Sequence, residues 1–405
     1  MSESHAGRKY AITSGTPLLA FVTFVIFIDA LGYGVVVPVL PLYAKTLGVS
    51  DFKLGVLFAA YAIALLLGSI PFGMLTDQYG RRPFILFGMF AMAGSFVFYA
   101  LSNAYWMLLL GRVLNGFAGA ATWSAALALV GDRFDESEMG SKMGFLISGM
   151  AVGGIAGPLV GGFLADAFGY HAPFYAIAGA CFVGGILTLF LQEDRCRLKQ
   201  ETSMLRQLIP LLKKRTVALA CVITLVTTIG FGLLEPIFPL YLKKNFKMNP
   251  AGIGLVFGVM MLAYAITSPL VGRLSDRVGR KPPILSGLLL TALLMPFLAI
   301  FKNVVAIFIL MAVLGATLVM FETPTLPLIT DSLEGEAGYG TAFGMVNFFW
   351  SLGYAIGPLI GGAIYEWKGL LAAIAVYSIL LVPLIVLVSI ALPGGKAKAT
   401  ASADA

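Results

Sequence analysis

The sequence is poor in charge, in histidine and in cysteine. Of its 405 residues, 12% are charged and two are histidines, whereas 59% are hydrophobic. A soluble protein carries about twice that share of charge on its surface, so a water-soluble fold and a disordered chain are excluded. The three cysteines lie far apart, which excludes a disulfide-stapled secreted scaffold. A mean hydropathy of +0.93 fits a chain whose solvent is a lipid bilayer.

Motifs of several function classes are also missing. The sequence contains no HExxH, no GxSxG and no GxxxxGK[ST], and its histidines, His5 and His171, lie in the tail and in a short loop. We therefore expect no enzyme activity, no metal site, no resident cofactor and no drive by ATP. The net charge of +7 is not accompanied by a nucleic-acid-binding motif, so nucleic acid is not an expected partner.

What is present is a series of long apolar runs. Backbone in hydrocarbon must satisfy its own hydrogen bonds, so runs of about 20 apolar residues predict membrane-spanning helices. The first run follows Arg8 and Lys9 but has no small-residue cleavage site, so we expect a helix rather than a signal peptide. The sequence predicts an all-α membrane protein with twelve transmembrane helices. The spans are residues 18–43, 52–76, 84–101, 105–130, 140–165, 172–192, 216–242, 251–275, 284–301, 304–330, 339–365 and 370–392.

The basic residues predict the orientation. Of 27 lysines and arginines, nineteen fall on the side of the termini, seven on the other side, and Arg112 inside a span. Because positive loops stay in the cytoplasm, both termini are expected there, in a cell membrane that we take to be a bacterial inner membrane. The longest polar gap, residues 193–215, contains seven basic residues. The predicted organisation is a six-helix half at 1–192, a basic cytoplasmic linker at 193–215, and a second six-helix half with a short tail at 216–405.

An internal repeat at an offset of about 199 residues supports the two halves. Pro38 to Tyr43 matches Pro236 to Tyr241, GMLTDQYGRRPFIL matches GRLSDRVGRKPPIL, and GPLVGGFLAD matches GPLIGGAIYE. The halves point the same way, so they are parallel repeats related by an axis along the membrane normal. This layout is typical of a transporter in which one half rocks on the other around a shared site.

Several segments resemble motifs of the major facilitator superfamily, and the resemblance covers essentially the whole chain. The segment with Gly73, Asp77, Gly80, Arg81 and Arg82 resembles its cytoplasmic loop signature. LLLGRVLNGFAGA resembles its fourth-helix motif, and GGIAGPLVGG is similar to the fifth-helix motif of its drug/proton antiporters. The resemblance implies the major facilitator fold.

A narrower resemblance is to the vesicular monoamine and acetylcholine transporters and their bacterial relatives. It is carried by FIDALGYGVVVPVLP, FGLLEPIFP, the segment 321–327 and GYAIGPLIGGAI. That family exchanges protons for cationic amines, and its acidic residues in helices 1, 7 and 10 fall on Asp29, Glu235 and Glu322. The chain departs from it where a helix-2 lysine falls on Tyr61 and its helix-11 aspartate partner on Asn347. A bacterial multidrug or amine exporter therefore fits better than a synaptic-vesicle protein.

Charges inside the spans need a reason independently of any resemblance, because each costs about 2.5–3.5 kcal/mol on insertion scales. Glu235 precedes Pro236, and burial disfavours its charged form, so it is the first candidate for the proton site. Asp29 lies beside Gly32 and Gly34, which we expect to loosen the helix.

Two further charges complete this set. Glu322 lies shortly before Pro324, so its span is expected to break there. Arg112 stays charged and must be paired, with Asp29 as the first choice and with either a permanent latch or proton coupling as its role.

Aromatic residues at similar depth can hold a cation over their faces, although packing or lipid contact is the commoner role of any one of them taken singly. The residues predicted to bind substrate are Asp29, Glu235, Glu322, Tyr33, Tyr61, Asn347, Trp350 and Tyr354, with Trp123, Phe231 and Phe349 as further candidates by span depth.

Two kinds of segment are predicted to move. The loop signature offers a close-packing glycine, a tight turn, a helix-capping aspartate and arginines for acids or lipid headgroups, and the glycines of helices 5 and 11 let neighbouring helices slide. The predicted gating residues are Gly73, Asp77, Gly80, Arg81, Arg82, Gly157, Pro158, Asp276 and Arg280.

Together these features predict a proton-coupled antiporter of cationic or lipophilic amines and drugs that works as a monomer by alternating access. Its expected partners are a small cationic organic substrate, protons and the lipid bilayer. A uniporter or proton symporter of a neutral solute such as a sugar is the alternative. Three acids against one arginine in the spans favour a cation.

Overall fold

The structure, a computed structural model, describes residues 15–134, 136–191, 213–332 and 339–392. Every element assigned in these ranges is an α-helix. The helices are α1 Gly15–Thr46, α2 Asp51–Tyr79, α3 Arg82–Leu101, α4 Tyr105–Gly131, α5 Glu136–Phe168, α6 Ala172–Thr188, α8 Arg215–Phe246, α9 Pro250–Val278, α10 Lys281–Leu294, α11 Phe297–Ile300, α12 Val304–Glu322, α13 Thr325–Ser332 and α14 Tyr339–Ala391.

Within the described ranges, ten helical segments are long and apolar enough to cross a membrane. The number of twelve stays a prediction: α14 joins two predicted spans across Gly369, whose backbone is not helical, and α6 is apolar but 17 residues long. Most of the predicted basic linker lies outside the described residues.

The bundle is apolar outside as well as inside. Leu67, Ile379 and Ile390 are 62%, 69% and 73% exposed, while the valines and leucines of α1 and α8 are buried. A soluble bundle would place polar side chains on such a surface, because exposed apolar area is costly in water. The multi-pass membrane protein expected from composition is therefore what the fold presents.

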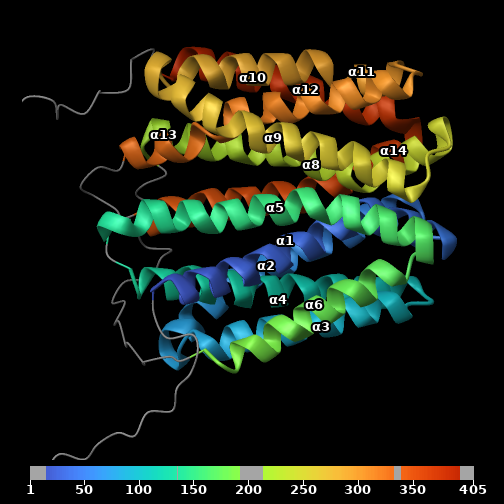
Figure 1. The fold of residues 1–405 in the computed structure, drawn as a ribbon. Coiled ribbons are helices and arrows are strands. Elements are labelled where there is room, and N and C mark those ends of the chain that lie inside the picture. Colours follow the sequence, from blue (N-terminus) through green and yellow to red (C-terminus); the bar gives the residue numbers. More distant parts are fainter. Residues whose placement is uncertain (1–14, 135, 192–212, 333–338, 393–405) are drawn as a thin grey trace, which may run out of the picture.

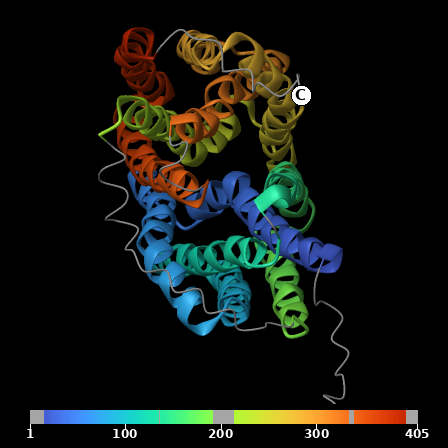
Figure 2. The same ribbon diagram turned by 90° about the vertical axis from the view of Figure 1, so that its left-hand side faces the viewer.

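Two groups of helices lie side by side (Figure 1), with α1–α6 in blue to green and α8–α14 in yellow-green to red. Within the first group α1 packs on α5, and α4 packs on α2 and α3. Within the second group α8 packs on α14, and α12 packs on α9 and α10. The groups meet where α2 contacts α14 and where α5 contacts α9, as the view along the helices also shows (Figure 2).

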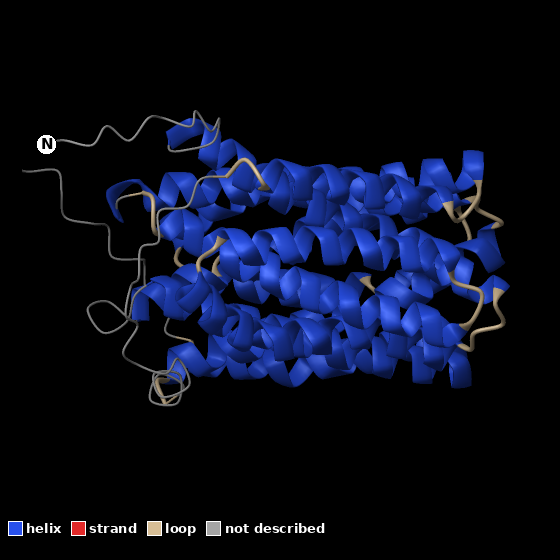
Figure 3. Ribbon diagram, turned by 90° about the horizontal axis from the view of Figure 1, so that it is seen from below, coloured by secondary structure: helices blue, strands red, loops and turns tan. Residues whose placement is uncertain are grey.

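The bundle has two ends (Figure 3), which we call apical and basal and define by the turns that each contains. The apical end contains the turns at residues 47–50, 102–104, 169–171 and 247–249. The basal end contains the turns at residues 80–81, 132–134 and 279–280.

The glycines of α1 act as contact points and not as a weakness in the helix. α1 is helical from Gly15 to Thr46, so the expected loosening is wrong. A Cβ on Gly34 would lie 2.9 Å from the Cα of Gly157, and one on Gly32 would lie 2.8 Å from the ring of Phe96. Glycine is needed here because α1 meets α5 and α3 too closely for a side chain.

Candidate functional site

Glu235 lies where the two groups of helices touch. It is 6% exposed, in the middle of α8 and directly before Pro236. The Tyr33 hydroxyl, from α1, donates to Glu235 Oε2 at 2.5 Å, and the Tyr354 hydroxyl, from α14, makes a longer bond of 3.4 Å to Oε1. One buried carboxylate therefore receives hydroxyl groups from both helix groups.

Asp29 is held inside the first group. It is 7% exposed, and the Trp123 indole Nε1 from α4 donates to its Oδ2 at 2.7 Å. A Cβ on Gly119 would lie 3.6 Å from Asp29 Oδ1 and 3.5 Å from the Tyr61 hydroxyl. The absence of a side chain at Gly119 leaves the room in which these polar groups approach each other.

Glu322 ends α12 and is held inside the second group. The Tyr264 hydroxyl, from α9, donates to its Oε2 at 2.7 Å. α12 stops at Glu322 and α13 starts at Thr325. The predicted break beside Glu322 is confirmed, because Pro324 cannot donate the backbone hydrogen bond that would continue the helix.

Arg112 is fully buried in α4 but does not form the predicted pair with Asp29. Its Nε donates to the Leu57 carbonyl at 3.1 Å. Its guanidinium carbon lies 4.6 Å from the centre of the Tyr61 ring and 4.9 Å from that of Phe58. Asp29 lies level with Gly119, seven residues and about 10 Å further along α4. Aromatic faces and a carbonyl hold the charge in place of a carboxylate.

A row of aromatic rings connects the two groups beside Glu235. Tyr33 lies 5.2 Å from Tyr61 and 6.3 Å from Tyr354, and Tyr354 lies 4.2 Å from Trp350, between ring centres. Tyr61 thus meets rings and a guanidinium where the resembled family has a lysine. Asn347, its expected partner position, is exposed.

At the apical end, backbone meets backbone between the groups. A Cβ on Gly162 of α5 would lie 2.5 Å from the Pro250 carbonyl oxygen of α9, and one on Gly254 would clash with the Pro158 carbonyl. The second crossing is equivalent, since a Cβ on Gly362 would lie 2.6 Å from the Asp51 carbonyl oxygen of α2. Gly162 and Gly362 thus approach the opposite group closely, whereas the predicted gating residue Gly157 meets Gly34 of α1 within its own group.

Two acids at matching places of the repeat close this end further. Glu366 Oε2 accepts the Phe52 backbone N–H at the start of α2, at 2.7 Å. Asp166 Oδ2 accepts from Asn249 Nδ2 at 2.8 Å, and Asn249 caps the start of α9. Carboxylates are favourable at helix N-termini because unpaired N–H groups and the helix dipole point there.

The loop signature organises the basal end. Arg81 Nε donates to Asp132 Oδ2 at 2.9 Å and its Nη1 binds Asp77, which links α2, α3 and α4. Burial alone would lower the pKa of Arg81, but the hydrogen bonds to Asp132 and Asp77 outweigh it and raise that pKa. Arg280 repeats part of the arrangement with Asp276 at 2.5 Å.

The next basic residue of each copy meets a helix end. Arg82 Nη2 donates to the Leu189 carbonyl at the end of α6, at 2.6 Å. Lys281 Nζ donates to the Ser389 carbonyl near the end of α14, at 2.7 Å. Cations stabilise the negative ends of helices in this way.

Gly80 supplies the expected tight turn. Its φ is 96°, and the equivalent Gly279 has φ 90°. Gly73, by contrast, has nothing within 4 Å of an added Cβ, so its expected close packing is not seen in this conformation.

Gly80→Ala is expected to destabilise the protein by about 1–3 kcal/mol, because the backbone conformation is one that L side chains rarely adopt. Gly73→Ala, in the helical part of the same segment, serves as the matched control and should stabilise slightly. Thermal unfolding of both purified variants in detergent checks this. Equal midpoints would contradict it.

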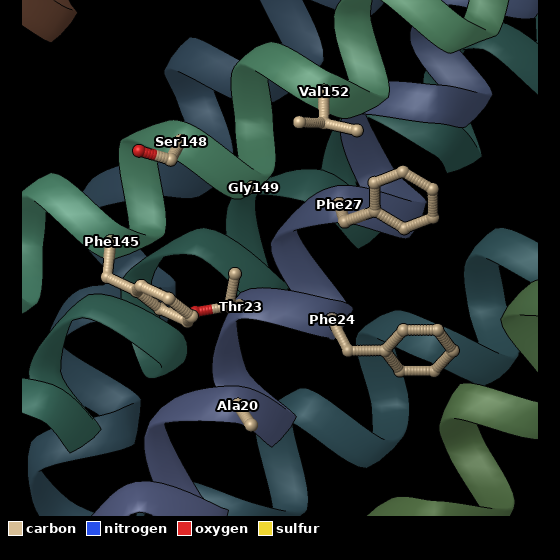
Figure 4. Close-up of a pocket in the computed structure, with 8 residues that line it drawn as sticks. All are labelled: Ala20, Thr23, Phe24, Phe27, Phe145, Ser148, Gly149 and Val152. Atoms are coloured by element: carbon tan, nitrogen blue, oxygen red, sulfur yellow. The ribbon is translucent and has the colours of Figure 1, made fainter.

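An apolar groove of about 410 Å³ lies elsewhere, between α1 and α5 (Figure 4). It is lined by Ala20, Thr23, Phe24, Phe27, Phe145, Ser148, Gly149 and Val152. Ala20 and Asp29 are nine residues apart, about half a turn around α1. The groove therefore faces away from the candidate site.

A family model that matches nearly the whole chain identifies the family. The family model described as Major Facilitator Superfamily matches residues 22–225 and 220–405. The chain belongs to this superfamily. It is therefore a membrane transporter, and its helix groups follow the fold of that superfamily.

Relatives of this superfamily member include transporters of two kinds. It is 27% identical over 340 residues to the synaptic vesicular amine transporter of Homo sapiens. The alignment covers 82% of this chain and 66% of that protein. It is 26% identical over 357 residues to multidrug resistance protein 2 of Bacillus subtilis (strain 168), and this alignment covers 84% of this chain and 87% of that protein.

Solved structures share the fold at low identity. A bacterial homolog of the human lysosomal transporter Spinster matches with a TM-score of 0.80 and 14% identity, over 95% of this chain and 97% of that chain. The nucleoside transporter NupG matches with a TM-score of 0.75 and 13% identity, over 92% and 98%.

Three groups of the site were missed by sequence reasoning. Tyr264, which holds Glu322, could have been found because a tyrosine hydroxyl within an apolar span needs a partner. Asp166 and Glu366 end the repeated GPLVGGFLAD and GPLIGGAIYE segments, and their matching positions were a usable signal. Trp123, predicted as a further substrate-binding candidate, donates a hydrogen bond to Asp29.

Proposed function

We propose that this transporter is a proton-coupled antiporter that moves cationic or lipophilic amines and drugs by alternating access. The observation that carries the proposal is the Glu235 carboxylate, which is buried at the contact between the two helix groups and bonded from both. A carboxylate in this place can exchange a proton for a cation, because burial makes an uncompensated negative charge unfavourable.

Three features support a cationic substrate. Within the part of the chain that the structure describes, Asp29, Glu235 and Glu322 are each bonded to an aromatic O–H or N–H group and form no ion pair. The rings of Tyr33, Tyr61, Tyr354 and Trp350 lie in a row beside Glu235, and aromatic faces attract organic cations. The relatives named for amines and for multidrug resistance agree with this chemistry.

We further propose the organisation and orientation expected from sequence: twelve crossings in two six-helix halves, with the basal end and both termini in the cytoplasm. The structure then represents the state closed toward the outside, because Gly162, Gly362, Asp166 and Glu366 all make their contacts at the apical end. Gly73 would pack closely in the opposite state. Asp77, Arg81, Asp276 and Arg280 act as basal gating residues.

The test is transport by the purified protein in proteoliposomes with an imposed pH gradient. A labelled lipophilic amine should accumulate on the acidic side above the passive level of protein-free liposomes, since exchange against protons concentrates a cation where protons are abundant. Collapse of the gradient with a protonophore should abolish the accumulation. Accumulation that survives the collapse would contradict proton coupling, and uptake of a neutral sugar would instead favour the symporter or uniporter.

A further inference from the structure

Tyr33 makes a hydrogen bond between the helix groups at a different level from three others that join them among the described residues. The bonds of Glu366 to Phe52, of Asp166 to Asn249 and of Lys243 to Tyr170 lie at the apical end. The bond from Tyr33 to Glu235 lies deep in the bundle, near the middles of α1 and α8. It therefore joins the groups at the level of the proposed proton site.

The ring of Tyr33 is held independently of this bond. It lies 5.2 Å from the Tyr61 ring, 6.3 Å from the Tyr354 ring and 5.9 Å from the Arg112 guanidinium carbon. The glycines on either side of it, Gly32 and Gly34, pack against α3 and α5. With ring and backbone supported, loss or gain of the hydroxyl bond can occur without rebuilding α1.

The strength of the bond depends on what Glu235 carries. A hydroxyl group donates its strongest hydrogen bond to a charged carboxylate, at the short distance of 2.5 Å seen here. A protonated carboxyl group offers a weaker acceptor, and an ammonium ion competes for the same oxygens. The Tyr33 hydroxyl thus occupies the place on Glu235 that a proton or a cationic substrate would take.

We propose that Tyr33 is a positioning residue that makes the contact between the two helix groups depend on the occupancy of Glu235. This inference rests on the proposed proton-coupled antiport. Charged, substrate-free Glu235 binds Tyr33 and holds the groups together at mid-membrane. A proton or an ammonium ion on Glu235 displaces the hydroxyl and releases the groups, so that only an occupied site permits the change of conformation.

Other ionisable groups face the pair from each neighbouring element. Tyr61 of α2, Arg112 of α4 and Tyr354 of α14 lie close enough to act electrostatically on Tyr33 or Glu235. Glu322 of α12 and Tyr264 of α9 in turn act electrostatically on Tyr354. Since Arg112 and these tyrosines remain in a hydroxyl-deletion variant, its effect reports on the Tyr33 bond.

Tyr33→Phe tests the inference, because it removes the hydroxyl and keeps the ring. We expect pH-gradient-driven accumulation of the labelled amine to fall by about tenfold or more, the size of a lost hydrogen bond to a charged group. Amine binding and amine-for-amine exchange at equal pH should fall much less than accumulation, because the ring of Tyr33 stays in place, and the pH profile of exchange should shift. Tyr175→Phe, on the exposed face of α6, is the matched control.

A double-mutant cycle separates coupling from structure. If Tyr33 acts through Glu235, then Tyr33→Phe should cause no further shift in the pH profile of exchange in a Glu235→Gln background. Wild-type accumulation in Tyr33→Phe, or parallel loss of binding, exchange and accumulation, would overturn the inference. Failure of antiport itself would be seen separately, as a wild-type protein that ignores the pH gradient.

Discussion

Glu235→Gln is expected to reduce pH-gradient-driven amine accumulation to the level of empty liposomes. Glutamine keeps the shape of the side chain and can still accept from Tyr33 and Tyr354, but it cannot take up or release a proton. The pH gradient then has no group at the contact between the helix groups through which to act. Amine exchange at equal pH should be reduced but not abolished, because it requires no net proton movement and loses only the charge of Glu235 from the amine site.

The measurement compares labelled-amine accumulation with and without a pH gradient. The control is Glu138→Gln, since Glu138 is exposed at the start of α5, on the basal side. Full accumulation by Glu235→Gln would assign the proton to Asp29 or Glu322 and would sink the role given to Glu235. If exchange is lost together with accumulation, size-exclusion chromatography of the variant distinguishes a folding defect from a loss of amine binding.

Gly162→Ala is expected to block transport while leaving the protein folded. The added Cβ would lie 2.5 Å from the Pro250 carbonyl oxygen, so α5 and α9 must separate at the apical end. A backbone clash of this kind costs about 1–3 kcal/mol, which lowers the population of the apically closed state by roughly 5- to 150-fold. Each transport cycle passes through that state.

Gly154→Ala is the matched control for this prediction. It lies on the same helix, and an added Cβ there meets nothing within 4 Å. Helix propensity changes equally in both variants, so a difference in transport rate reports the apical contact alone. Accessibility of an apical cysteine label to a membrane-impermeant reagent should rise in Gly162→Ala. Equal transport and equal labelling in the two variants would contradict the gating role of this crossing.

Much of the architecture could be predicted because a bilayer leaves few choices. Apolar runs had to be helices, and the repeat placed Pro158 and Pro358 at matching crossings, where the structure shows backbone contact with α9 and α2. The break after Glu322 followed from Pro324. Each of these expectations depends on local chemistry or on a repeated pattern along the chain.

The partners of the charged groups could not be predicted, because they depend on how far helices slide along one another. Asp29 lies about 10 Å further along α4 than Arg112, so it binds Trp123. Arg112 is instead surrounded by the rings of Tyr61 and Phe58 and the Leu57 carbonyl. No spacing in the sequence contains that offset. Tyr33, expected to line a substrate site, is bonded to Glu235 across the helix groups.

The sequence by itself determined that this chain is a helical membrane transporter of a known superfamily, and which few charges lie in its spans. It could do so because hydrocarbon penalises every unsatisfied backbone group and every charge, and that penalty is readable from composition and order. Only the tertiary structure decided which hydroxyl, indole or carbonyl each charge meets, and at which end the groups close. Those contacts arise between helices distant in sequence, and their geometry is set by packing.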